Sequence, residues 1–230
     1  LCRLANRCGH ALLHSLEITP TDLRKLLLGT LLVRQLESFQ SFVLLVFRGL
    51  HAPADIVLRN IAENMFIVGA IGKDEEFADR YVLAEELSRK KALVRLRDHG
   101  IRTGAEVGQE IHDTIAELEQ RIDDERIRRI PTERIAQIAE LSDYYDTLYS
   151  YTSMAVHTSP RRLDHALQAN ERREVEGLCY GPASEDLDMS LDFALSMVLY
   201  TFHEVATRFG RPTAEIEGLQ TRNQEVAGGA

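Results

Sequence analysis

A first set of polar residues with the types and spacing to do chemistry lies in one short stretch. Arg59, Asn60, Glu63 and Asn64 fall within an arc of about 140° if this stretch is helical. Apolar residues continue the same arc above and below them, which makes the set a polar island on a buried stripe. A buried arginine needs an anionic partner, which is either Glu63 one turn away or a bound ligand. An internal salt bridge that fixes helix packing and a ligand site therefore both remain open.

A second set lies later in the chain. Tyr145, Tyr149, Ser153 and His157 are each four residues apart, which places three hydroxyls and an imidazole on one helix face. Histidine titrates near neutral pH and is the usual general base. Half-buried side chains with satisfied polar ends are the structural alternative. A Ser–His nucleophile pair is disfavoured, because Ser153 lacks the Gly-x-Ser-x-Gly turn that exposes a hydrolase serine.

The two sets together resemble a bacterial family known chiefly as a domain of unknown function. Leu58-Arg59-Asn60-Ile61-Ala62-Glu63 is similar to its Leu-Arg-x-x-x-Glu helix, and Tyr149-x-x-x-Ser153-x-x-x-His157 is similar to its later Tyr/Ser/His helix. The resemblance covers roughly residues 25–160. That family in turn distantly resembles the HEPN proteins, many of which are metal-independent ribonucleases in toxin and antiviral systems and are usually dimers.

The resemblance implies a catalytic pair, Arg59 and His157. His157 would accept the proton of a ribose 2′-hydroxyl, and Arg59 would hold the phosphate and stabilise its developing charge. HEPN ribonucleases carry an arginine shortly before the histidine, but residues 150–152 are Ser, Tyr and Thr. The arginine would therefore come from a different helix. Further substrate-binding residues implied here are Glu63, which would orient Arg59, and Asn60, Tyr149 and Ser153.

The charge balance limits the partners. The chain has 27 Lys and Arg against 36 Asp and Glu, a net charge of −9, which disfavours indiscriminate binding to nucleic acid or to an anionic membrane. Local charge still permits RNA or a nucleotide. Arg161 and Arg162 follow His157 directly and could contact a phosphate backbone, unless they belong to a solvated loop. A second arginine cluster surrounds Pro131 and comprises Arg121, Arg126, Arg128, Arg129 and Arg134.

The elements that must position these residues are helical. Apolar residues make up 44% of the chain, and only 14 Gly and 6 Pro interrupt it. Periodicity and termination signals predict a single-domain, all-α, HEPN-like bundle of about six to seven helices. The expected helices cover residues 19–48, 53–71, 74–99, 107–122, 132–158 and 187–209. Residues 53–71 are apolar around most of their circumference, which predicts a central helix.

The remaining segments are expected to be less regular. We expect an N-terminal segment over residues 1–18, the bundle over 19–210 and a disordered polar tail over 211–230. Residues 160–186 carry several Gly and Arg and predict an irregular region. Within it, a short helix over 163–169 and an extended piece over 178–180 are possible.

Three cysteines, Cys2, Cys8 and Cys179, are too few for a disulfide framework and favour the cytoplasm. No membrane association is expected, since charged residues interrupt the most apolar region, residues 23–50. No cofactor or metal is expected either. The sequence has no phosphate-binding glycine loop, and Cys2, Cys8, His10 and His14 lack a recognised zinc spacing.

The leading hypothesis is a HEPN-like protein that acts on RNA or a nucleotide, as a metal-independent endoribonuclease in a toxin or phage-defence setting. The main alternative is a non-catalytic module that dimerises or docks a cognate protein partner through the apolar seam at Val107–Ile122. A third alternative is a small-molecule sensor with Arg59 as the anion anchor, which predicts a cavity beside Arg59.

Overall fold

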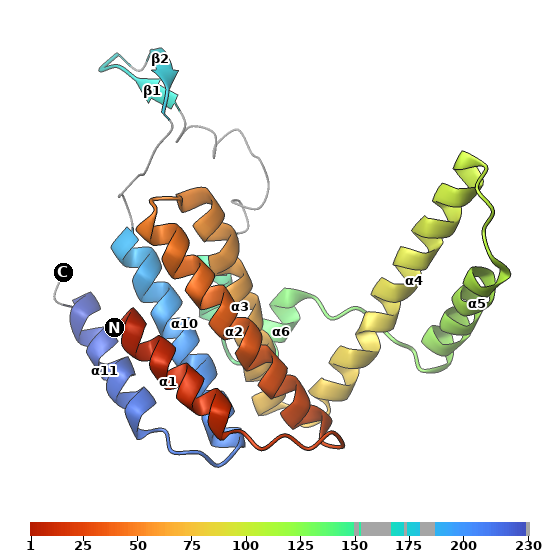
Figure 1. Cartoon of the computed structure of the whole chain (residues 1–230), viewed down its shortest axis with the longest axis horizontal. Coiled ribbons are helices and arrows are strands. Elements are labelled where there is room, and N and C mark those ends of the chain that lie inside the picture. The colour runs from red at the N-terminus through yellow and green to blue at the C-terminus, as the bar shows by residue number, and fades with distance from the viewer. Residues whose placement is uncertain (150–151, 153–166, 173, 180–186, 229–230) are drawn as a thin grey trace.

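The computed structural model describes residues 1–149, 152, 167–172, 174–179 and 187–228. Helices dominate this part of the chain, and the prediction of an all-α fold is confirmed (Figure 1). The elements in chain order are α1 (Cys2–Ser15), α2 (Leu23–Phe47), α3 (His51–Lys73), α4 (Phe77–Thr103), α5 (Gln109–Asp124), α6 (Thr132–Ile138), α7 (Ser142–Tyr144), the π-helix η1 (Tyr145–Tyr149), β1 (Leu167–Ala169), β2 (Val175–Leu178), α10 (Leu187–Arg208) and α11 (Ala214–Gly228).

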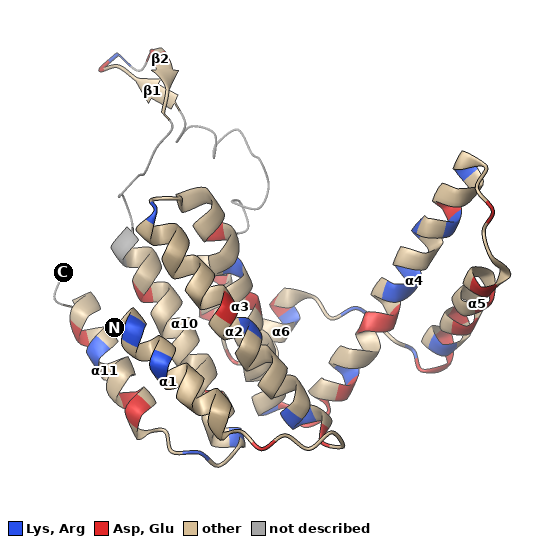
Figure 2. Cartoon of the chain, in the orientation of Figure 1, with Lys and Arg blue, Asp and Glu red and all other residues tan. Residues whose placement is uncertain are grey.

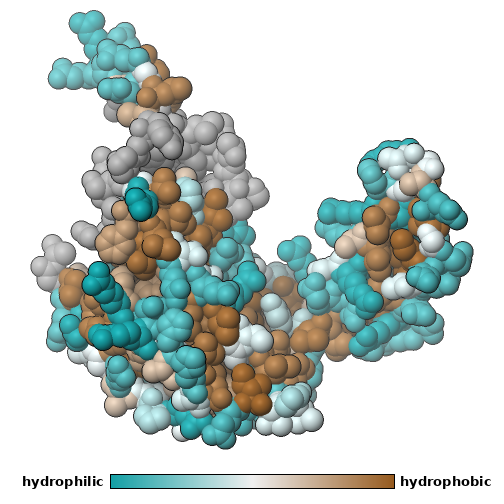
Figure 3. Space-filling model, viewed as in Figure 1, coloured by the Kyte–Doolittle hydropathy of each residue, from teal (hydrophilic) through white to brown (hydrophobic). Residues whose placement is uncertain are grey.

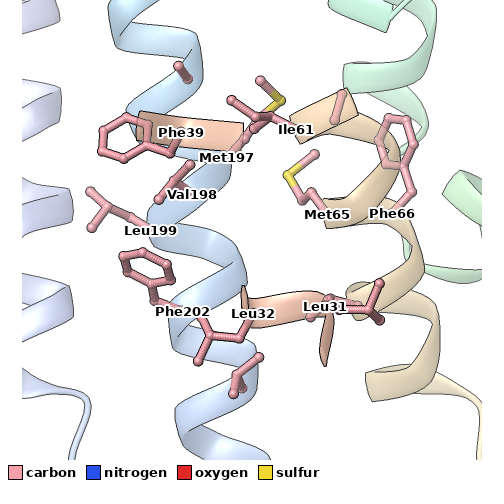
Figure 4. Close-up of a cluster of buried hydrophobic side chains, with 14 of the residues drawn as sticks. Leu31, Leu32, Phe39, Ile61, Met65, Phe66, Met197, Val198, Leu199 and Phe202 are labelled. Carbon is pink, nitrogen blue, oxygen red and sulfur yellow. The ribbon is translucent and has the colours of Figure 1, made fainter. Parts of the chain in front are cut away.

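The core lies between α2, α3 and α10, with α1 and α11 packed on the outside (Figure 1). Figure 4 shows side chains of these three helices meeting in one apolar cluster. Ile61, Met65, Phe66 and Val68 of α3 have no exposed surface, although they point in several directions around the helix. Helix α3 is therefore central, as its composition predicted.

The ends of α2 follow local chemistry. Asp22 is the N-cap, and its carboxylate accepts a hydrogen bond of 3.0 Å from the backbone N–H of Lys25. The helix therefore begins at Leu23, three residues after Pro20, and not at residue 19 as expected. After the helix, Gly49 has φ +67°, a left-handed conformation that glycine adopts without steric cost. The turn that follows lets α3 return beside α2.

A buried polar network fixes the three core helices to one another. The Asn64 Nδ2 donates to Leu31 O at 3.0 Å and to Gln35 Oε1 at 2.7 Å, both on α2. Gln35 Nε2 donates to Thr201 Oγ1 of α10 at 3.1 Å. Asn64, Gln35 and Thr201 are all almost fully buried. Asn64 therefore serves helix packing, which is the structural alternative for this member of the polar island.

Replacing Asn64 with alanine should lower the free energy of unfolding by about 2 kcal/mol, because it leaves the buried side-chain carbonyl of Gln35 without its donor and removes the side-chain hydrogen bond to the Leu31 carbonyl. Urea unfolding followed by circular dichroism measures the change. Asn60→Ala on the half-buried side of the same helix is the matched control and should cost about 0.5 kcal/mol or less. Equal losses for the two variants would contradict the role given to the network.

Helices α4 and α5 form an arm that projects from the bundle (Figure 1). Ile115 and Leu118 of α5 are 3% and 5% exposed, and they lie in the hairpin that α5 makes with α4. The docking surface predicted at Val107–Ile122 is therefore partly occupied by the chain's own α4. Figure 2 shows cations along α4 and acidic residues on α5. Lys90 pairs with Glu119 at 3.0 Å, and Arg121 with Glu86 at 2.9 Å, which joins the two helices.

Both ends of the chain differ from the expectation. Residues 2–15 form α1, which packs against α2 and α10, and residues 214–228 form α11, which packs against α10 and α1. The prediction of a disordered tail was wrong, because Ile216 and Leu219 are buried. In the irregular region, residues 167–169 form a strand that pairs antiparallel with 175–178, and the predicted helix over 163–169 does not extend through them. Residues 163–166 lie outside the described residues.

The packing of α1 is testable through its cysteines. Cys8 is buried, and burial raises the pKa of its thiol to about 11, so little thiolate exists at pH 8. Cys179 is exposed. Iodoacetamide at pH 8 should therefore modify Cys179 well before Cys8, which peptide mass spectrometry resolves. Equally fast modification would contradict the packing of α1, and urea-unfolded protein provides the control in which both thiols react.

One described helix, α2, has the length and composition to cross a membrane. This is weak evidence, because core helices of soluble proteins satisfy the same test. Here α2 contacts α1, α3, α4 and α10, and its apolar side chains Leu32, Phe39 and Phe42 lie in the core. The arrangement is compatible with a soluble protein. Figure 3 shows polar and apolar residues intermixed on the visible face of the bundle.

Candidate functional site

Three side chains from the two sequence motifs meet in a closed cluster. Arg59 Nε donates to Glu63 Oε1 at 3.1 Å, and Arg59 Nη2 donates to the Tyr149 hydroxyl at 2.8 Å. The Tyr149 hydroxyl in turn donates to Glu63 Oε1 at 2.8 Å. Each side chain therefore contacts both others. The motif on α3 and the motif that begins at Tyr149 are joined directly, although 86 residues separate Glu63 from Tyr149 in the chain.

The local structure around Tyr149 explains how it reaches α3. Tyr145 and Tyr149 lie four residues apart in the π-helix η1 and on the same side of it. Their rings stack at 5.0 Å with an interplanar angle of 22°. Phe66 of α3 meets the Tyr149 ring edge-on at 5.8 Å. Tyr149 is only 6% exposed, so packing holds its hydroxyl in place at the surface of α3.

The electrostatics of the cluster keep Arg59 charged and Tyr149 neutral. Burial lowers the pKa of Arg59, but the neighbouring Tyr149 and Glu63 outweigh it and raise that pKa above its usual value. Burial also raises the pKa of the Tyr149 phenol. The Thr132 side chain and the charge of Arg59 act in the opposite direction, and Glu63 adds to the rise. Tyr149 is therefore a hydrogen-bond donor at neutral pH and cannot serve as a base.

This geometry presents an oriented cation. The Arg59 guanidinium lies 4.8 Å from the centroid of the Tyr149 ring, so stacking as well as hydrogen bonding fixes its plane. The Arg59 side chain is 21% exposed. Within the cluster it donates through Nε to Glu63 and through one Nη2 hydrogen to Tyr149. A guanidinium has five N–H donors. No hydrogen bond within the described residues uses the other three, which can therefore bind an anion there, and phosphate fits their forked geometry.

The predicted site residues fall into three groups. Arg59, Glu63 and Tyr149 come together, with Glu63 beside Arg59 as expected. Tyr149 contacts Arg59 and Glu63, and its predicted contact with a substrate stays a prediction. Asn60 is half-buried on α3 and takes no part in the hydrogen bonds of the cluster. The remaining candidates lie outside the described residues, and these are Ser153, His157, Arg161 and Arg162.

Two further residues near the cluster, Asp55 and Thr132, were not predicted from the sequence. Asp55 lies one helical turn before Arg59 on α3, so it shares the face of Arg59 and Glu63, and it is only 8% exposed. The Asp55–Arg59–Glu63 spacing of four residues was a usable signal. Thr132 begins α6, and its side chain lowers the pKa of Tyr149. No local pattern points to Thr132, because only the packing of α6 on α3 brings it there.

A metal centre has no donor set within the described ranges. No group of three or more His, Cys, Asp or Glu side chains there could hold an ion. His10, one of the donors considered from the sequence, lies 2.9 Å from Gln40 Nε2 through its Nε2.

The sequence was compared with protein families, curated proteins and solved structures, and one family matches. The model of a family of unknown function, DUF5677, matches residues 25–174, which include most of α2 and all of α3, the arm and the cluster. No curated protein and no solved structure matches the chain. The match confirms the expected resemblance to an uncharacterised family. The likeness to HEPN proteins stays a prediction.

Proposed function

We propose for this chain, which belongs to the DUF5677 family of unknown function, that it is a HEPN-like, metal-independent endoribonuclease acting on single-stranded RNA. The observation that carries the proposal is the direct contact between Arg59 of the first motif and Tyr149 of the second. Arg59 binds the scissile phosphate with the N–H groups that the cluster leaves available. Glu63 and Tyr149 hold its plane, and Asp55 lies on the same helix face.

The chemistry assigned to His157 is general-base catalysis. His157 follows Tyr149 by eight residues. It accepts the proton of the ribose 2′-hydroxyl, whose oxygen attacks phosphorus as the bond to the 5′-oxygen breaks. The leaving 5′-oxygen takes a proton from water, and the products are a 2′,3′-cyclic phosphate and a 5′-hydroxyl. Arg59 stabilises the charge on the phosphoryl oxygens. Ser153, Asn60, Arg161 and Arg162 are proposed as further substrate contacts.

The test uses purified protein, EDTA and a labelled single-stranded RNA. We expect cleavage that leaves a cyclic phosphate, and none of an oligonucleotide with the same sequence and 2′-deoxyribose throughout. His157→Ala should abolish cleavage while leaving RNA binding within about threefold, because the base does not hold the phosphate. Cleavage of the deoxy oligonucleotide, or full activity of His157→Ala, would overturn the assignment. Absence of both RNA cleavage and RNA binding would overturn the proposed function.

The proposed setting is the cytoplasm, in a toxin or phage-defence role, and the three free cysteines are consistent with a reducing compartment. Induced expression in a bacterial host should slow growth, and the His157→Ala variant should relieve this effect. Unimpaired growth with the wild-type chain, expressed to the same level and active on RNA in vitro, would contradict the toxin role.

We propose that the chain forms a homodimer. The second candidate function is a non-catalytic module that docks a partner protein. The observation that favours an interface is the projecting arm, where Leu96 and Ile101 are 55% and 64% exposed. Light scattering should give twice the chain mass, and the Leu96→Glu/Ile101→Glu variant should give the monomer mass with an unchanged circular dichroism spectrum. A monomeric wild-type chain would contradict this proposal.

A further inference from the structure

A hollow of about 320 Å³ lies at the base of the arm. Its walls come from the first half of α4 and from the segment that leads from α5 back to α6. The volume is at the lower end of the range for small-ligand sites, about 300–1,000 Å³. It suits one flexible nucleotide and not a duplex. The lining residues are Tyr81, Val82, Ala84, Glu85, Ser88, Arg129 and Ile130.

The lining combines an aromatic wall with one cation. Tyr81 stacks on the fully buried Phe77 at 5.8 Å with an interplanar angle of 25°, so the orientation of its ring is fixed. Val82 and Ile130 add apolar surface. Arg129 is exposed, and Glu85 and Ser88 offer hydrogen-bonding groups on the α4 side. A nucleobase stacks on such an aromatic wall, and a guanidinium binds the phosphate that accompanies it.

The hollow is linked to the Arg59–Glu63–Tyr149 cluster along the chain and through electrostatics. Ile130 is two residues before Thr132, whose side chain acts on the Tyr149 phenol. On the opposite wall, burial raises the pKa of the Tyr81 phenol, and the charges of Arg34, Glu85 and Glu63 also act on it. Tyr81 is therefore within electrostatic reach of Glu63. Each wall thus has one link to the cluster, along the chain from Ile130 to Thr132 and by charge between Tyr81 and Glu63.

We propose that this hollow is a nucleotide subsite for the RNA segment that flanks the scissile phosphate, with Tyr81 stacking a base and Arg129 binding its phosphate. The inference rests on the proposed function, since it places a second part of the same RNA. It adds Tyr81 and Arg129 as residues that determine affinity and position without taking part in bond cleavage. The subsite lies within the residues that the family model covers.

The neighbouring arginine provides a matched control. Arg128 and Arg129 are both exposed and adjacent in the chain, but only Arg129 lines the hollow. Either substitution by alanine removes the same charge from the same segment. A difference between the two variants therefore reports the subsite and not the overall charge of the protein.

The experiment measures binding of a fluorescein-labelled, 2′-O-methyl RNA hexanucleotide by fluorescence anisotropy at several salt concentrations. Arg129→Ala and Tyr81→Leu should each raise Kd about tenfold, whereas Tyr81→Phe, which keeps the ring, and Arg128→Ala should stay within about twofold. The slope of log Kd against log salt should fall by about 0.7 in Arg129→Ala alone, the value for one lost phosphate contact on a single strand. Circular dichroism confirms that each variant is folded.

The outcomes separate this inference from the proposed function. If Arg59→Ala weakens RNA binding but Arg129→Ala matches Arg128→Ala, the subsite is overturned and the proposed function stands. If Tyr81→Phe binds as weakly as Tyr81→Leu, the stacking role is overturned. If the wild-type chain binds no RNA, the proposed function fails, and the subsite fails with it.

Discussion

Arg59→Ala should lower RNA cleavage at least about 100-fold, the usual cost of removing one donor that stabilises charge at a reacting phosphate or carbonyl. The reason is geometric as well as electrostatic. Glu63 and Tyr149 fix the guanidinium through two of its donors, and the Tyr149 ring supports its plane. Single-turnover cleavage with excess enzyme measures the chemical step without a contribution from product release.

Arg59→Lys should restore little of this activity. A lysine ammonium retains the charge, but it cannot reproduce the planar fork that contacts Glu63, Tyr149 and a phosphate together. Arg7→Ala is the control, because Arg7 is an exposed arginine on α1 outside the cluster. If Arg59→Ala cleaved RNA as fast as Arg7→Ala, the cluster would be a helix-packing contact and nothing more.

The sequence predicts that Arg59 and Glu63 of α3 pair with each other. It does not predict which polar residues of this helix contact α2 and which contact η1. Arg59 and Glu63 are four residues apart, and this spacing alone brings their side chains together. Asn64 lies within the same 140° arc but turns to Leu31 and Gln35 of α2. A central helix such as α3 contacts several other helices around its circumference. Side chains within one 140° arc can therefore contact different neighbouring helices. Only the positions of α2 and η1 decide which residue serves which.

The terminal helices α1 and α11 were not among the expected helices, because their burial depends on contacts with the rest of the bundle. Ala5, Cys8, Gly9 and Leu12 are buried, and their spacing of three and four residues is a helical signal in the sequence. Gly9 packs where a side chain would overlap Phe202 and Leu36, and this contact depends on tertiary structure. Helix α11 has a narrower apolar stripe, and its burial comes from its packing on α10 and α1.

The residues that join the core to the site could be predicted only in part. The apolar periodicity of α3 indicates that Phe66 is buried, and it is fully buried. Nothing in the sequence indicates that its ring contacts both Tyr145 and Tyr149. These contacts depend on the π-helical turn at residues 145–149, and such a turn has no simple sequence signature. Phe66 thus links the stability of the bundle to the position of the Tyr149 hydroxyl.

Phe66→Ala should therefore affect stability and activity separately. Loss of a fully buried phenylalanine ring lowers the free energy of unfolding by about 3–5 kcal/mol. It also removes the edge contact that holds Tyr149, so the Arg59 guanidinium loses part of its fixed orientation. RNA cleavage by the folded variant should fall about tenfold or more, since small displacements of a catalytic group are costly. Urea unfolding and single-turnover cleavage, at a temperature where the variant is folded, measure the two effects.

Phe39→Ala distinguishes the two effects. Phe39 is 1% exposed on α2 and lies in the core cluster, but the ring contacts of Tyr145 and Tyr149 come from Phe66 (Figure 4). The Phe39→Ala substitution should lower the free energy of unfolding as much as Phe66→Ala does, by about 3–5 kcal/mol. It should leave RNA cleavage by the folded protein nearly unchanged. Phe66→Leu, which keeps most of the buried volume but not the ring, should be more stable than Phe66→Ala and still cleave slowly. If cleavage followed stability alone across these three variants, Phe66 would be a core residue with no role in positioning Tyr149.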